Sequence, residues 1–169
     1  EIHYHPPPID SGMGLVDDTI TEFIEIYNTS DSTVPLYDPQ QYFNNGVRYA
    51  DGRTNTWKIR GGVSFDFPEG ASLGAGKFAL IVNFDPTNTS LVLQNFTNKY
   101  PALASLIPSE VKIYGPYKGK LSNSGATIEV RRPDAPQGPT RPDFGLVPYI
   151  TVDLVNYNDT LPWPISPDG

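Results

Sequence analysis

The chain contains no cysteine among its 169 residues. Disulfide bonds, zinc–thiolate sites and cysteine nucleophiles are therefore excluded. The sequence also lacks an apolar run long enough for a membrane-spanning helix. Positive charge is scarce, because 12 Lys and Arg stand against 19 Asp and Glu and the net charge is −7. An acidic protein repels phosphate backbones, so we expect no nucleic-acid partner.

Glycine and proline are abundant, with 15 and 18 residues, yet 38% of the chain is hydrophobic and 12% is aromatic. A disordered chain would be poor in such residues, whereas a β-rich domain places Gly and Pro at its turns and aromatic residues on its strands. The length fits one domain covering residues 1–169. No signal peptide precedes the first strand-like residues, and we interpret the N-terminus as a processed or excised boundary.

Strand-like alternation of apolar and polar residues recurs along the chain and predicts an antiparallel β-sandwich. The predicted strands cover residues 22–27, 63–67, 77–82, 111–114, 127–130 and 149–157. One helix is expected within residues 87–99, where apolar residues have helical spacing, and a second short one at 102–106. We expect residues 9–19 to be polar and flexible. The predicted class is therefore all-β with one or two short helices inserted.

Several segments occur in the order seen in one known family. They include residues 1–7, 22–28, 63–70, 73–78, Gly115-Pro116-Tyr117 through Gly125, 153–159 and Pro162-Trp163-Pro164. On these segments the chain resembles the lamin-tail domain, and it looks most like the bacterial, secreted branch of that family. The resemblance implies an immunoglobulin-like sandwich. It also implies a non-catalytic extracellular or cell-surface module that binds a protein or a surface polymer, or spaces neighbouring domains.

Two stretches depart from this family pattern. Residues 37–60 are longer than the loop normally found there, and residues 133–148 look like an insertion. The resemblance supplies no catalytic residues, so it leaves any function particular to this chain to these two loops. The acidic charge also departs from the basic surface with which lamins contact DNA, and that activity is not carried over.

Metal sites have two sets of candidate ligands. His3 and His5 are two positions apart on an expected strand, so both project from one face, but the sequence shows no third ligand. Asp17 and Asp18, with the region of Asp159, offer the oxygen ligands that calcium prefers, but no EF-hand pattern is present. Solvated side chains are the simpler interpretation of both sets, and we predict no metal and no cofactor.

Aromatic residues suggest an alternative, a carbohydrate-binding module or an accessory domain of carbohydrate processing. Exposed rings of Tyr114, Tyr117, Tyr157 or Trp163 could stack on sugar faces. For Trp163, which lies between two prolines, packing in the core is the favoured interpretation.

Catalysis has no matching pattern. Both histidines lie at the start of the chain beside a proline run, which argues against a Ser–His–acid triad. Carboxylates that could act in pairs are frequent in any acidic domain, namely Asp66, Glu69, Asp85, Asp153 and Asp159. We predict no catalytic residue and no enzymatic activity.

Overall fold

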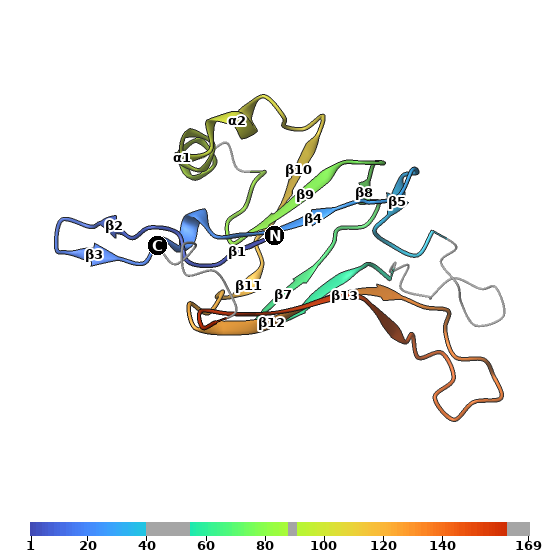
Figure 1. The fold of residues 1–169 in the computed structure, drawn as a ribbon. Coiled ribbons are helices and arrows are strands. Elements are labelled where there is room, and N and C mark those ends of the chain that lie inside the picture. The colour runs from blue at the N-terminus through green and yellow to red at the C-terminus, as the bar shows by residue number, and fades with distance from the viewer. Residues whose placement is uncertain (40–54, 88–90, 162–169) are drawn as a thin grey trace.

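The computed structural model describes residues 1–39, 55–87 and 91–161, and these residues form a two-layer β-sandwich (Figure 1). The first sheet contains, in spatial order, β1 (Ile2–His3), β4 (Phe23–Tyr27), β9 (Phe78–Val82) and β10 (Val111–Tyr114). The second contains β11 (Lys118–Gly119), β7 (Val63–Asp66), β6 (Lys58–Gly61), β12 (Gly125–Pro133) and β13 (Tyr149–Asn158). The predicted all-β sandwich is confirmed.

One strand pair departs from the antiparallel rule. Strands β9 and β10 run parallel, with Phe78 opposite Val111. Parallel neighbours need a crossover connection, and here α1 (Leu91–Lys99) and α2 (Pro101–Ala104) provide it. Both helices lie over the outer face of the first sheet (Figure 1). The two short helices predicted between β9 and β10 are therefore confirmed within the described residues.

The main core lies between the sheets and is built by period-2 alternation. On β7, Val63 and Phe65 are buried, while Asp66 on the opposite face is exposed. Ile59 of β6 and Ile81 of β9 are fully buried in the same cluster. Burial on this scale, at roughly 25 cal/mol per Å² of apolar surface, is the main force that holds the two layers together.

The segment from residue 115 to 125 forms the corner that leads into β12. It places Tyr117 and Leu121 in the core, with exposed fractions of 4% and 0%. Gly125 has a φ of +117°, and a Cβ atom there would lie 2.6 Å from the carbonyl oxygen of Tyr157. Only glycine combines that backbone conformation with so close an approach, so this turn brings the start of β12 against the end of β13.

A second core lies between the first sheet and the helices. Its centre is Phe96 of α1, which is fully buried. Its ring lies 5.4 Å from that of Phe84, 5.1 Å from that of Tyr100 and 6.3 Å from that of Phe23. The helices are therefore fastened to the sandwich mainly through aromatic contacts.

The sequence led to predictions for segments near both ends of the chain. Residues 9–16, expected to be flexible, form a hairpin of β2 (Ile9–Asp10) and β3 (Leu15–Val16) that projects from the sandwich (Figure 1). That prediction was wrong because the apolar residues pair across a turn, where Ser11 N–H donates to Gly14 O at 3.1 Å. The expected Trp163 closure lies outside the described residues.

The structure describes parts of the two loops, residues 37–60 and 133–148, that depart from the family pattern. Residues 40–54 of the first lie outside the described part. A short ribbon precedes them, in which β5 (Val34–Pro35) pairs with β8 (Ser72–Leu73). In the second loop, β12 continues to Pro133, and residues 134–148 form a series of turns before β13.

The aromatic core predicts a specific loss of stability. Phe96→Ala should lower the free energy of unfolding by about 3–5 kcal/mol, because it removes a fully buried ring. Leu91→Ala on the same helix is the control, since Leu91 is 73% exposed, and it should change stability by less than about 0.5 kcal/mol. Urea unfolding measures both. Equal effects would contradict this account of how the helices attach.

Candidate functional site

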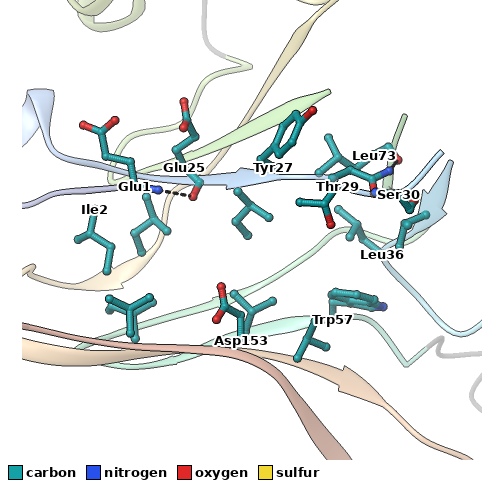
Figure 2. Close-up of a pocket in the computed structure, with 18 residues that line it drawn as sticks. Glu1, Ile2, Glu25, Tyr27, Thr29, Ser30, Leu36, Trp57, Leu73 and Asp153 are labelled. Carbon is teal, nitrogen blue, oxygen red and sulfur yellow. Dashed lines mark hydrogen bonds between the residues drawn. The ribbon is translucent and has the colours of Figure 1, made fainter. Parts of the chain in front are cut away.

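A cleft of about 580 Å³ opens between the two sheets (Figure 2). Its volume falls within the range of roughly 300–1,000 Å³ that is common for binding pockets. Most of the lining is apolar, with Ile26 on β4, Leu36 after β5, Trp57 before β6, and Val155 on β13. Polar groups lie mainly near the rim, which is the usual composition of a binding site.

The cleft lies between the inner faces of the two sheets. Ile24 and Ile26 of β4 line one side, and Val130 of β12 and Val155 of β13 line the other. Ile26 and Val155 are half-buried, and they pack against the edge of the main core.

Strand β4 borders the cleft and lies between β1 and β9 in the first sheet. Glu25 N–H donates to Glu1 O at 2.8 Å, and Glu1 N donates to Glu25 O at 3.1 Å. Such exchange defines one hydrogen-bonded pair of an antiparallel ladder. Strand β4 is therefore held by hydrogen bonds on both sides at this point.

The far end of β4 is held by a buried amide. Asn28 is 7% exposed, and its Nδ2 donates to the carbonyl oxygens of Ser32, Leu73 and Gly74 at 2.8–2.9 Å. Its Oδ1 accepts from the N–H of Ser30 at 3.0 Å. These bonds fix the chain immediately after β4.

The charged side chains that line the cleft are all acidic. Glu1, Glu25 and Asp153 belong to the lining, and no Lys, Arg or His does among the described residues. Glu25 and Glu1 point away from the gap between the sheets, whereas Asp153 points into it (Figure 2). Asp153 is thus the carboxylate that a molecule in the cleft would meet.

The regular pairing of β13 with β12 sets the face that Asp153 occupies. Val130 of β12 pairs with Asp153 and Ile128 pairs with Val155, so Asp153 and Val155 lie on one face of the sheet. Because Val130 is buried in the sandwich, its partner Asp153 shares that inner face. The register shifts only at the next position, where Arg131 pairs with Thr151 and Val152 is an extra residue.

A second group of polar side chains closes a corner of the sandwich around Glu22. Glu22 is fully buried, and its Oε2 accepts a hydrogen bond from the Tyr117 hydroxyl at 3.0 Å. Nearby, Asp17 Oδ2 accepts from Lys120 Nζ at 2.5 Å and from Asn123 Nδ2 at 3.2 Å. Glu22 therefore has two neutral partners, the Tyr117 hydroxyl and the backbone of Leu121, while Lys120 binds Asp17.

Burial dominates the acid–base behaviour of this corner. It raises the pKa of Glu22 to about 7, against the opposing effect of the Tyr117 hydrogen bond. Burial likewise raises the pKa of Tyr157 to about 12, and burial with the adjacent Glu22 raises that of Tyr117. The Lys120 hydrogen bond lowers the pKa of Asp17. Glu22 therefore changes charge near neutral pH.

The predicted aromatic platform is not formed by the described tyrosines. Tyr117 and Tyr157 are each 4% exposed, and the ring of Tyr157 lies 4.5 Å from that of Tyr4 in the core. Tyr114 is half-buried, with its ring 5.4 Å from that of Phe67. Stacking on a sugar needs an exposed ring face, and the burial of Tyr117 and Tyr157 does not favour it.

The candidate metal ligands are directed to different partners. The ring of His3 stacks on Phe23 at 5.0 Å, and burial lowers its pKa. Asp18 pairs with Lys99 at 2.6 Å, while Asp17 pairs with Lys120. The charge of His5 contributes to the lowering of the Asp17 pKa. The described part of the chain holds no group of three or more His, Cys, Asp or Glu that could bind a metal.

Two of the carboxylates considered for catalysis bind neighbouring residues. Asp66 pairs with Arg60 at 2.5 Å, and Asp85 accepts hydrogen bonds from the N–H and hydroxyl of Thr87 at 2.9 and 2.6 Å. Glu69 and Asp159 are exposed. Of the five, Asp153 is the one that lines the cleft.

Sequence patterns did not reveal the most important groups of the two sites. Glu22 precedes a predicted strand, and nothing local distinguishes it from a solvated carboxylate. The cleft depends on how the two sheets face each other, which involves pairing between distant segments. The Asn-Thr-Ser turn after Tyr27 was the one available signal, since asparagine in a turn often bonds the backbone.

Comparisons with known proteins leave the chain without an assigned family. No family model, no curated protein and no solved structure matches it. The resemblance to lamin-tail domains therefore stays a prediction. Neither α1 nor α2, the helices of the described residues, is long and apolar enough to cross a membrane.

The buried carboxyl predicts a pH dependence of stability. The fold favours protonated Glu22, so its contribution is fully present below pH 4.5 and is lost as the pH rises through about 7. The free energy of unfolding should fall by about 3 kcal/mol over this interval. Glu22→Gln keeps an acceptor for Tyr117 without ionising, so the variant should gain stability relative to the native chain over this interval.

Urea unfolding of both chains between pH 4 and about 8.5 measures the difference. Glu25→Gln on the adjacent strand is the matched control, because Glu25 is partly exposed at the rim. If the free energies of unfolding of the native chain and of Glu22→Gln differ by the same amount at every pH in this range, Glu22 ionises normally in the fold.

Proposed function

We propose that this chain is a non-catalytic binding module whose inter-sheet cleft takes up an extended polypeptide segment. The observation that carries the proposal is the apolar lining of a cleft of about 580 Å³ that opens between the two sheets. Concave, mostly apolar sites with a few polar groups are the usual form of a binding pocket.

The cleft supplies affinity and selectivity through side chains. Ile26 of β4 and Val155 of β13 are half-buried apolar residues that line it. An occupant that covers them removes apolar surface from water, at roughly 25 cal/mol per Å². Alternate side chains of an extended segment point to one side, so the bound segment should place apolar residues on the side that faces the cleft.

The setting of this activity is part of the proposal. The resemblance to secreted lamin-tail domains favours an extracellular or cell-surface module that attaches one protein to another. The burial of Tyr117 and Tyr157 gives no support to the carbohydrate alternative.

The apolar lining gives a direct test. Peptides selected from a random display library on the native chain should lose about tenfold or more in affinity for Val155→Asp, because a carboxylate in the lining would lose its hydration when the cleft is covered. Leu154→Asp is the matched control, since Leu154 neighbours Val155 on β13, does not line the cleft and is 46% exposed. This control should leave the affinity nearly unchanged.

Fluorescence anisotropy measures the affinities, and urea unfolding checks that both variants are folded. Equal affinity for Val155→Asp and Leu154→Asp would overturn binding in the cleft. A library that yields no enriched peptide on the native chain would overturn the proposed function itself.

A further inference from the structure

We infer a second binding site, for a small organic cation that carries an ammonium group on an apolar body the size of two fused rings. The site goes beyond the proposed function, because it lies on the opposite face of the first sheet from the inter-sheet cleft. There, a cavity of about 340 Å³ opens between the α2 region and the outer face of β4, β9 and β10 (Figure 1).

The walls of this cavity are almost entirely apolar. Phe78 and Leu80 of β9 and Val111 of β10 line it from the sheet, and Leu103 and Leu106 line it from the helical side. Leu103 is half-buried and Leu106 is 40% exposed, so part of this apolar surface is in contact with water. An occupant that covers it is stabilised by roughly 25 cal/mol per Å².

Aromatic rings form a further part of the lining. The ring of Phe23 lies 6.3 Å from that of Phe96 and 5.7 Å from that of Tyr100, and all three residues line the cavity. The Tyr100 hydroxyl donates to Thr21 O at 3.2 Å, so this polar group is already bonded within the fold. Aromatic side chains attract organic cations through the quadrupole of the ring.

Glu25 is the one charged residue of this lining among the described residues. It pairs across the strands with Leu80, which is 4% exposed, and the alternation of β4 places Phe23 on the same face. Figure 2 shows the Glu25 carboxylate pointing away from the gap between the sheets, which is toward this outer face. Lys99 at the end of α1 does not neutralise it, because Lys99 pairs with Asp18.

This carboxylate determines the charge of the occupant. A purely apolar molecule in the cavity would remove water from Glu25 and offer nothing in return. Loss of hydration without compensation disfavours a charged group strongly. An ammonium group replaces the lost water with a charge-assisted hydrogen bond, so the cavity favours an amine over a neutral molecule of equal size.

The volume determines the size of the occupant. A cavity of about 150 Å³ lined by Leu, Ile and Phe takes up benzene. The present cavity is more than twice as large, at about 340 Å³. A single ring would leave much of it unfilled, whereas two fused rings with a short amine arm match it.

The test uses two probes that differ in one group. Naphthylethylamine carries an ammonium group at neutral pH, and naphthylethanol has the same body with a neutral hydroxyl. Chemical-shift titration of the isotope-labelled full chain gives the affinity for each probe and shows which residues respond. We expect the amine to bind about threefold to tenfold more tightly than the alcohol. The largest shifts should occur in α2, β9 and β10.

Three variants separate the charge from the cavity, and urea unfolding checks that each is folded. Glu25→Gln keeps the size of the side chain and should abolish the preference for the amine. Ala102→Trp adds a large ring to the lining and should weaken both probes about tenfold or more. Ala104→Trp on the same helix is the matched control, because Ala104 is exposed and does not line the cavity. It should leave both affinities nearly unchanged.

The outcomes decide each part of the inference. Equal binding of the two probes by the native chain, or a preference that Glu25→Gln leaves unchanged, would overturn the assignment of a cationic ligand. Equal affinities for Ala102→Trp and Ala104→Trp, or shifts concentrated on β12 and β13, would show that the probes bind elsewhere. If neither probe binds at millimolar concentration, the site itself is wrong. The binding of a polypeptide in the cleft is decided separately, by Val155→Asp.

Discussion

The packing of two sheets face to face is the constraint on which the site depends. The inner faces of both sheets supply the main core, and at the edge of that core they supply the walls of the cleft. The alternation that buries Ile24 of β4 leaves Ile26, two positions on, half-buried in the cleft lining. Core and cleft thus arise together from one arrangement of strands.

Buried polar residues hold β4 in place beside the cleft. Glu22 stands immediately before β4 and bonds Tyr117, and Asn28 stands immediately after it and bonds three carbonyl groups. Each end of β4 is therefore fixed by a polar side chain that is itself buried. Such contacts are specific in geometry, whereas apolar packing tolerates sliding. We interpret them as the reason that β4 keeps its position without shifting to cover the cleft.

Local sequence patterns predicted the main strands and helices well, but they did not predict which of them lie next to each other. The alternation in residues 63–67 and the apolar run of 77–82 identified β7 and β9, because one buried face imposes period 2 and two buried faces impose continuous apolarity. The crossover helix followed from its helical spacing. The site escaped prediction because Glu22 meets Tyr117 at a separation of 95 residues, and the face that Asp153 occupies depends on the pairing of β13 with β12. The sequence left open whether Tyr157 packs in the core, and it did not predict the burial of Tyr117, because neither segment shows locally which part of the chain covers its ring.

The carboxylates around the cleft have a consequence for the behaviour of many molecules together. An exposed apolar surface invites association between copies, and net charge opposes it. Two copies of this chain that met at their clefts would bring Glu1, Glu25 and Asp153 of each against those of the other. Their mutual repulsion disperses the molecules at neutral pH, and acid or salt removes it. The acidic lining of the cleft therefore also limits self-association.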